Sequence, residues 1–141
     1  MRFLLDTNIC STHLRRSGVL AHRFTQYGGR LYMPPIVLGE LYAWAHRRRN
    51  PVPLLRAIEQ DLLADIEVVD YDRVCAEQFG RVRGTLLQQG VSVNTVDLMI
   101  ATVALTHDLT LVTHNTKDYP RKKPGFWEKA GLLGASGWPY S

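Results

Sequence analysis

The sequence predicts an α/β fold with a mostly parallel sheet. Short apolar runs alternate along the chain with longer segments whose apolar residues recur at helical spacing. Glycine and proline clusters separate these segments, and the sequence shows no internal repeat or low-complexity tract. Strands that alternate with helices pair in parallel, and active sites in such sheets lie at the carboxyl ends of the strands.

The first half of the chain begins this alternation. Residues 3–5 form an apolar run that stops at Asp6, and apolar residues then recur at helical spacing from Ile9 to Phe24. Residues 31–33 are predicted to form a second strand. A helix is predicted from Pro35 to about Arg48, because proline's missing N–H costs nothing at a helix start.

The second half continues the same pattern. The predicted elements are, in order, a loop at 50–53, a helix with apolar positions from Leu54 to Leu63, and a strand at 66–69. They are followed by a helix from Asp72 to about Gly90, a helix capped by Asn94 that runs to about His107, and a strand at 109–113. Residues 124–141 are rich in Gly, Pro and Trp, and no element is predicted for them.

Length and composition favour one domain spanning residues 1–141. A hydrophobic fraction of 45% with 21% charged residues argues against disordered and coiled-coil classes. Asp6 interrupts any signal-peptide apolar region, and no later run approaches the ~20 apolar residues of a membrane span. We therefore expect a cytoplasmic protein that does not associate with a membrane.

The two cysteines, Cys10 and Cys75, both fall in predicted amphipathic helices. Neither belongs to a C-x-x-C motif or to a Cys/His pattern with zinc-site spacing. We therefore expect buried, reduced thiols instead of a disulfide.

The chain has a net charge of +4, and basic residues cluster at two places in its sequence. One follows His46 and comprises Arg47, Arg48 and Arg49, and the other comprises Arg121, Lys122 and Lys123. Such clusters attract phosphate backbones, although a modest positive balance is equally expected from solubility alone. A basic surface around an acidic pocket is what a metal-dependent enzyme acting on a polyanion would require.

Glu40 is the most informative acidic residue. On a helix its neighbours at i−4, i−3, i+3 and i+4 are Ile36, Val37, Ala43 and Trp44, all of which are apolar. We therefore expect its side chain to point toward the core. The alternative is a glutamate at the edge of the apolar face whose carboxylate reaches water or pairs with an arginine.

Asp97 also shares a helix face with core residues, since Ile100, Ala101 and Ala104 follow it at i+3, i+4 and i+7. It lies three residues after Asn94, where an acid favours the helix dipole and can complete a capping arrangement. Two roles therefore remain open for Asp97, that of a metal ligand and that of a residue in the helix cap.

Asp6 and Asp118 have simpler alternatives, an N-cap and a turn residue respectively. Taken together, however, the four acids recur at the ends of predicted elements. Ionised carboxylates in apolar surroundings are costly unless they are paired, hydrogen-bonded or bound to a cation. Hard cations such as Mg²⁺ or Mn²⁺ take oxygen ligands of this kind, so the sequence predicts a divalent-metal site.

Four motifs in register closely resemble the PIN-domain ribonucleases, and more narrowly the VapC-type toxins of type II toxin–antitoxin systems. They cover about Met1 to Tyr119 and are Leu4-Leu5-Asp6-Thr7-Asn8, the single Glu40 in an apolar helix, Asp97-Leu98-Met99-Ile100-Ala101-Thr102, and Leu111-Val112-Thr113-His114-Asn115 followed by Asp118-Tyr119. The resemblance implies a three-layer α/β/α sandwich and an endoribonuclease dependent on Mg²⁺ or Mn²⁺.

In that family the main metal-site acids would correspond here to Asp6, Glu40 and Asp97. The bound ion would activate a water for in-line attack on a phosphodiester, leaving 5′-phosphate and 3′-hydroxyl ends. Thr7, Asn8 and Thr113 would orient the acids or the phosphate by hydrogen bonds.

The sequence departs from the family pattern at one position. Many members carry an acid two residues after the threonine that corresponds to Thr113, and here that residue is Asn115. Its amide oxygen can still bind a metal or position water but adds no charge, which leaves occupancy of a second metal site open. Asp118 is the candidate replacement, or it only shapes the loop.

The resemblance also implies partners. VapC-like toxins are typically homodimers, and a cognate VapB-like antitoxin lays its C-terminal segment across the acidic groove. Their substrate is usually a structured loop in transfer or ribosomal RNA, and the sequence does not specify which.

Two other classes compete with this interpretation. A haloacid-dehalogenase-type phosphatase needs an acid two residues after the strand-end aspartate, and the neutral Asn8 at that position disfavours it. Nucleotide-binding motifs of the G-x-x-x-x-G-K-[ST] and G-x-G-x-x-G types do not occur. The stronger alternative is a catalytically silent PIN-like module that binds RNA or protein.

Overall fold

The computed structural model describes residues 1–114 and 133–134. Within them, a single sheet has the strand order β3-β2-β1-β4-β5, and every pairing between neighbouring strands is parallel. The strands are β1 (Phe3–Leu5), β2 (Leu31–Met33), β3 (Glu67–Val68), β4 (Thr110–Thr113) and β5 (Leu133–Gly134). The predicted parallel sheet is confirmed, and β5 adds an edge strand in a region for which no element was expected.

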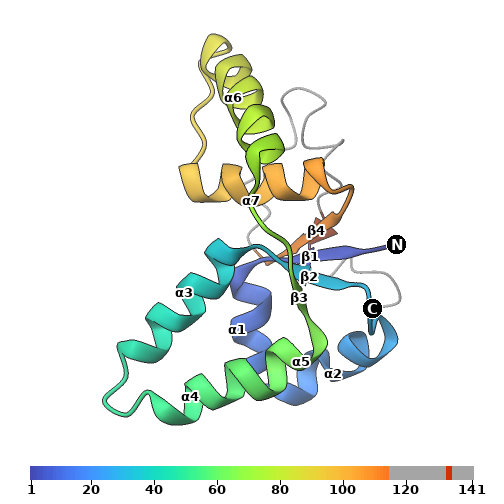
Figure 1. Cartoon of the computed structure of the whole chain (residues 1–141), viewed down its shortest axis with the longest axis vertical. Coiled ribbons are helices and arrows are strands. Elements are labelled where there is room, and N and C mark those ends of the chain that lie inside the picture. The colour runs from blue at the N-terminus through green and yellow to red at the C-terminus, as the bar shows by residue number, and fades with distance from the viewer. Residues whose placement is uncertain (115–132, 135–141) are drawn as a thin grey trace.

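Helices cover both faces of this sheet (Figure 1). They are α1 (Thr7–Arg15), α2 (Ser17–Gln26), α3 (Pro35–His46), α4 (Val52–Arg56), the π-helix η1 (Ala57–Leu62), α5 (Leu63–Asp65), α6 (Arg73–Gln88) and α7 (Thr95–Thr106). Helices α6 and α7 lie on one side of the strands, and α1 to α5 lie on the other. The expected three-layer α/β/α sandwich is therefore confirmed.

The central strands have apolar residues on both faces because helices cover both sides of the sheet. Phe3, Leu4 and Leu5 of β1 have no solvent exposure, and neither do Leu111 and Val112 of β4. A strand between two helical layers has no polar face, so its sequence shows a continuous apolar run instead of an alternating one.

Two helix boundaries differ from the prediction. The helical spacing from Ile9 to Phe24 is divided at Arg16, which ends α1 and precedes α2. The predicted loop at 50–53 is too long, because α4 already begins at Val52. Pro53 lies in the first turn of α4, where a backbone N–H would have no intrahelical acceptor, so proline is tolerated there.

The predicted caps of the last two helices are confirmed. The Asp72 carboxylate accepts a hydrogen bond of 2.9 Å from the Cys75 backbone N–H at the start of α6. The Asn94 side chain accepts from the N–H groups of Val96 and Asp97 at the start of α7. Cys10 and Cys75 are free and buried, as expected. In the described residues, no helix is both long and apolar enough to cross a membrane.

Candidate active site

Asp6 lies directly after β1, in the middle of the sheet's carboxyl edge, and caps α1. Its side chain is held through both carboxylate oxygens. Oδ1 accepts a hydrogen bond of 2.7 Å from the Thr7 backbone N–H, and Oδ2 accepts one of 2.8 Å from the Thr113 hydroxyl at the end of β4. Since Asp6 is only 6% exposed, these bonds supply the stabilisation that a buried carboxylate requires.

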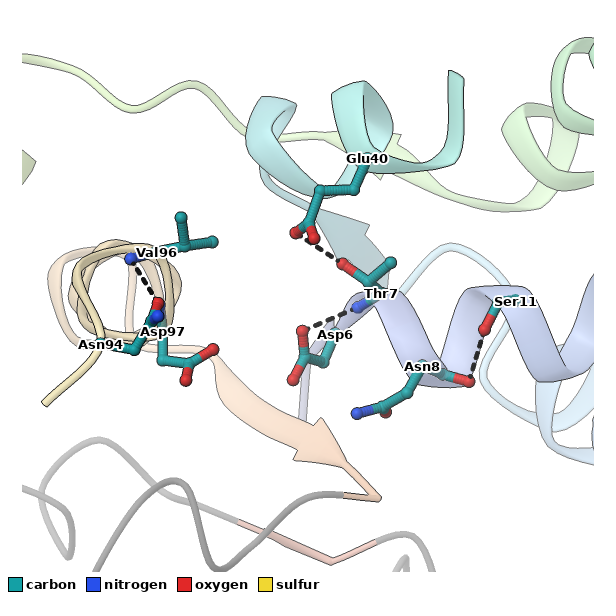
Figure 2. A pocket seen from close by; sticks show the side chains of 8 residues that line it. All are labelled: Asp6, Thr7, Asn8, Ser11, Glu40, Asn94, Val96 and Asp97. Carbon is teal, nitrogen blue, oxygen red and sulfur yellow. Dashed lines mark hydrogen bonds between the residues drawn. The ribbon is translucent and has the colours of Figure 1, made fainter. Parts of the chain in front are cut away.

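Glu40 reaches the same site from α3. Its Oε1 accepts a hydrogen bond of 2.9 Å from the Thr7 hydroxyl. The expectation that Glu40 points into the core is wrong, because Glu40 is exposed and Ala43 on the same face is exposed as well. The apolar face of α3 is narrower than its sequence suggests, so Glu40 lies at its edge, with its carboxylate directed into a pocket (Figure 2).

Asp97 reaches the site from the first turn of α7. Its backbone N–H donates to the Asn94 side chain at 3.3 Å, as the cap alternative predicted. Its carboxylate nevertheless points toward the side chain of Asp6 (Figure 2). The helix N-terminus therefore fixes the position of Asp97 and leaves its carboxylate facing the pocket, while metal binding by Asp97 stays a prediction.

The three acids line a single open pocket of about 460 Å³. Its described lining residues are Asp6, Thr7, Asn8, Ser11, Glu40, Asn94, Val96 and Asp97, and none of these is basic. In the described part of the chain, one group of potential metal-ligating side chains has all its ligand atoms within 4.8 Å of one another. That group does not include Asp6, Glu40 or Asp97. The oxygens of Asp6, Glu40 and Asp97 therefore do not all lie that close together, and the open pocket that they line has room for water.

Asn8 connects α1 to the end of β4. Its side-chain N–H donates to the Thr113 hydroxyl at 3.1 Å, and its side-chain oxygen accepts from the His114 backbone N–H at 2.9 Å. Thr113 thus receives a hydrogen bond from Asn8 and donates one to Asp6. These contacts fix the positions of Asn8 and Thr113, while their part in a reaction stays a prediction.

Several predicted residues lie outside the described part of the chain. They are Asn115 and Asp118, the candidates for a fourth ligand, and Arg121, Lys122 and Lys123, the second basic cluster.

A basic groove of about 230 Å³ adjoins the acidic pocket. It shares Thr7, Ser11 and Glu40 with the pocket and continues to Leu41, Arg15, Trp44 and Arg47. The guanidinium groups of Arg15 and Arg48 lie 4.8 Å and 5.1 Å from the centre of the Trp44 ring. The predicted cluster of Arg47, Arg48 and Arg49 is exposed, and the groove places Arg47 next to the acids.

Arg15 and Trp44 were not predicted as groove residues from the sequence. Trp44 follows Glu40 by four residues on α3, so helical spacing could have placed it beside the acid, but it was taken for a core residue. Arg15 lies on a different helix, and only the packing of α1 against α3 brings it to Trp44.

A parallel α/β fold that brings carboxylates from the end of β1, from α3 and from α7 into one pocket, beside a basic groove, is typical of metal-dependent phosphodiester hydrolases. The PIN domain family model matches residues 3–123. The chain therefore belongs to the PIN domain family, and the relatives described next place it among the ribonucleases of the VapC type.

Two curated relatives illustrate this membership. The tRNA(fMet)-specific endonuclease VapC of Shigella flexneri is 34% identical over 122 residues, which cover 86% of this chain and 92% of the relative. Ribonuclease VapC1 of Haemophilus influenzae strain R2866 is 34% identical over 133 residues, which cover 91% and 97%. These proteins favour the ribonuclease over the silent binding module.

Solved structures support the same assignment. A DNA-bound VapBC structure from Salmonella typhimurium contains a chain that is 28% identical, with a TM-score of 0.84 over 95% of this chain and 98% of the other. The VapBC2 structure from Rickettsia felis matches with a TM-score of 0.83 at 24% identity, which shows the fold alone. Nucleases of the PIN family are typically metal-dependent.

Proposed function

We propose that this ribonuclease is an endonuclease whose Asp6, Glu40 and Asp97 hold Mg²⁺ or Mn²⁺. One observation carries the proposal: the end of β1, the middle of α3 and the first turn of α7 each direct one carboxylate into the same pocket. These three residues are far apart in the sequence, so only the fold brings them together. Like charges gathered in this way repel one another unless a cation offsets them.

The donor set of the pocket fits a hard cation. Carboxylate, hydroxyl and amide oxygens line it, and such ligands suit Mg²⁺ and Mn²⁺ better than softer metals. The spacing of the acids leaves room for water, which these ions usually retain when one or two carboxylates bind them. A bound ion would lower the pKa of a water and offset the negative charge that develops on the phosphate and on the leaving oxygen.

Thr7 positions two of the acids at once. Its backbone N–H donates to Asp6, and its hydroxyl donates to Glu40. Because the same residue contacts both carboxylates, a shift of the first turn of α1 would move them together. Asp97 lies in the first turn of α7, where the helix dipole favours its ionised form.

Asp118 and the side-chain oxygen of Asn115 are proposed to complete the site. This part of the proposal rests on the family pattern, in which an oxygen ligand follows the threonine at the end of the last core strand. A charged Asp118 would add a ligand for a second ion, whereas Asn115 would position water.

The proposed substrate is a structured loop of transfer or ribosomal RNA. Relatives named as tRNA(fMet)-specific endonucleases support this class of substrate. The basic groove supports it independently, since arginine binds phosphate in a bidentate manner and the exposed part of an aromatic ring can stack on an unpaired base. Arg47, Arg48 and Arg49 would hold the backbone on this side, and Arg121, Lys122 and Lys123 would add to the same positive surface.

A VapB-like antitoxin is the proposed inhibitor, and a homodimer is the proposed assembly. The matched VapBC structures support an antitoxin partner. The acidic pocket fits this role, because a basic side chain inserted among its carboxylates would take the place of the metal.

Cleavage of end-labelled total cellular RNA tests the proposed function. The protein is assayed with Mn²⁺, with EDTA, and as the Asp97→Asn variant, which removes the charge and leaves the Asn94 cap in place. Discrete products should appear only for the unaltered protein with Mn²⁺. Glu67→Gln, at an exposed position on β3, is the matched control and should cleave normally. If the same RNA cleavage products appeared in EDTA or with Asp97→Asn, the proposed metal site would be refuted.

A further inference from the structure

A cluster of three chemically different side chains lies away from the nuclease pocket, where α6 begins and α7 ends. Asp72 caps α6, Cys75 lies in its first turn, and His107 follows the last residue of α7. Their ligand atoms all lie within 4.8 Å of one another. We propose that Asp72, Cys75 and His107 form a second metal site, which binds Zn²⁺ or a similar borderline cation.

The geometry favours a shared cation over a catalytic relay. Cys75 Sγ and Asp72 Oδ2 each lie 3.8 Å from the same atom, His107 Nε2. A Cys–His–Asp relay requires the thiol and the carboxylate on opposite nitrogens of the ring. Two groups that face a single nitrogen cannot form that relay, but they can surround one ion.

The separations suit tetrahedral coordination. With zinc bonds of about 2.0–2.3 Å, two ligand atoms of a tetrahedron stand roughly 3.3–3.7 Å apart. The observed separations of 3.8 Å exceed this range by little. A small side-chain rotation of His107 or Asp72 closes the difference, because both side chains are partly exposed, at 32% and 46%.

The surrounding contacts hold these ligands in position. Asp72 Oδ1 accepts from the Cys75 N–H at 2.9 Å, while Oδ2 is the oxygen nearer to His107. The backbone oxygen of His107 accepts a hydrogen bond of 2.9 Å from the side chain of Arg2. Hydrogen bonds that orient metal ligands in this way raise metal affinity.

The donor set differs from that of the nuclease pocket. Thiolate and imidazole are softer ligands than carboxylate oxygens and select zinc-like ions over Mg²⁺. Cys75 is fully buried, whereas Asp72 is exposed, so an ion can enter from solvent on the Asp72 side. Binding would release the thiol proton to solvent, and water would take the fourth position.

Local sequence spacing could not reveal this site. Cys75 and Asp72 are three residues apart at the start of α6, but His107 is 32 residues from Cys75. Neither cysteine belongs to a motif with zinc-site spacing in the sequence. In the fold, however, a histidine that is distant in the sequence lies 3.8 Å from Cys75. Packing of α6 against α7 brings the third ligand into place.

Titration with Co²⁺ tests the site directly. Protein freed of metal under reducing conditions should develop a thiolate-to-cobalt charge-transfer band as Co²⁺ is added, and Zn²⁺ should then abolish the band. Among its described lining residues, the nuclease pocket offers metal ligands that are oxygen atoms and no thiol, so it cannot produce this band. Asp97→Asn should therefore retain it, and the test is independent of the proposed ribonuclease site.

Matched variants identify the ligands. Cys75→Ser should lose the band, whereas Cys10→Ala, which alters the other fully buried cysteine, should keep it. His107→Gln and Asp72→Asn should weaken Co²⁺ binding about tenfold or more. Asparagine caps a helix as well as aspartate does, so Asp72→Asn should leave the start of α6 intact.

Three results would overturn the proposal: no band in the unaltered protein at saturating Co²⁺, a band that survives Cys75→Ser, or an equal loss in Cys10→Ala. If Cys75→Ser does not fold, His107→Gln and Asp72→Asn decide the outcome, because their side chains are partly exposed.

Discussion

The site depends at the residue scale on two threonine hydroxyls that donate to carboxylates. Thr7 donates to Glu40, and Thr113 donates to Asp6 while accepting from Asn8. Thr113 has no solvent exposure, so water cannot replace its hydroxyl if it is removed. Replacing such a threonine with valine removes the hydroxyl and keeps the shape of the side chain. The substitution therefore tests the hydrogen bonds of the hydroxyl alone.

Thr113→Val should lower both stability and metal affinity. It deprives buried Asp6 Oδ2 of a donor, which costs about 1–3 kcal/mol in the free energy of unfolding. It also frees the carboxylate to move, so the Mn²⁺ concentration for half-maximal cleavage should rise about 10-fold to 100-fold. Urea unfolding and a Mn²⁺ titration of RNA cleavage measure the two effects.

Thr102→Val is the matched control for this prediction. Thr102 is equally buried, but its hydroxyl donates to the Leu98 carbonyl within α7 and not to a carboxylate. The control should leave the Mn²⁺ dependence unchanged. Equal shifts in both variants would show that Thr113 acts through general stability alone.

His13 should make stability depend on pH. Burial lowers its pKa, while the charges of Asp65 and Asp61 raise it by less. Its ring stacks on Phe24 at 3.8 Å, and its buried Nδ1 has no hydrogen-bond partner among the described residues. The unfolded chain therefore binds a proton more readily than the folded protein near the ordinary pKa of 6.5.

The free energy of unfolding should accordingly fall as the pH drops through about 6.5, and level off once the folded protein is also protonated. His13→Leu should reduce this slope, as urea unfolding between pH 7.5 and 5.5 would measure. His22→Leu, at an exposed position on α2, controls for the loss of one histidine. A steeper slope in His13→Leu would contradict the argument.

At the element scale, the first turn of α7 combines a structural cap with the carboxylate of Asp97, which we propose as a metal ligand. Asn94→Ala removes the acceptor for the Val96 and Asp97 N–H groups, and should cost about 1 kcal/mol of stability. The frayed turn should also misplace Asp97 and lower the cleavage rate. Amide hydrogen exchange at Val96 and Asp97 would detect the fraying.

Asn94→Ser should rescue both properties, because serine also caps helices. If Asn94→Ala loses stability but cleaves at the normal rate, the cap does not position Asp97.

The helix starts that were predicted correctly are those that a side-chain cap or, for α3, a proline marks in the local sequence. Helices α6 and α7 begin after Asp72 and Asn94 as expected, because a cap is a local interaction between near neighbours in sequence. The division at Arg16 and the start of α4 were missed, since no side-chain cap marks either position. The π-helix from Ala57 to Leu62 was also missed, because its buried residues Ile58 and Leu62 lie four residues apart, a spacing that an α-helix also gives.

The site was predictable to the extent that its residues follow a strand or begin a helix. Asp6 and Asp97 are of this kind, and both line the pocket as expected. Glu40 was placed on the correct helix, but its exposure depends on which neighbouring helices cover α3. Contacts between distant segments, such as Arg15 with Trp44 and Cys75 with His107, arise from packing and leave no local signal.

For the whole molecule, the decisive property is the juxtaposition of opposite charges. The chain has a net charge of +4, yet its described pocket residues include three acids and no base. The adjoining groove carries Arg15 and Arg47. RNA should therefore be attracted by the groove, while the pocket repels its phosphates until a divalent cation offsets the acids.

Salt dependence of RNA binding tests this division of charge. In an Asp97→Asn background, which prevents cleavage, Arg47→Gln should weaken RNA binding at low salt. It should also reduce the slope of log K against log salt by about 0.7, as expected when one contact to a single-stranded phosphate is lost. Arg81→Gln, at an exposed position on α6, changes the net charge equally and should leave the slope unchanged. Equal slopes for the two variants would mean that total charge attracts the RNA, and that the groove beside Glu40 has no special part in holding it.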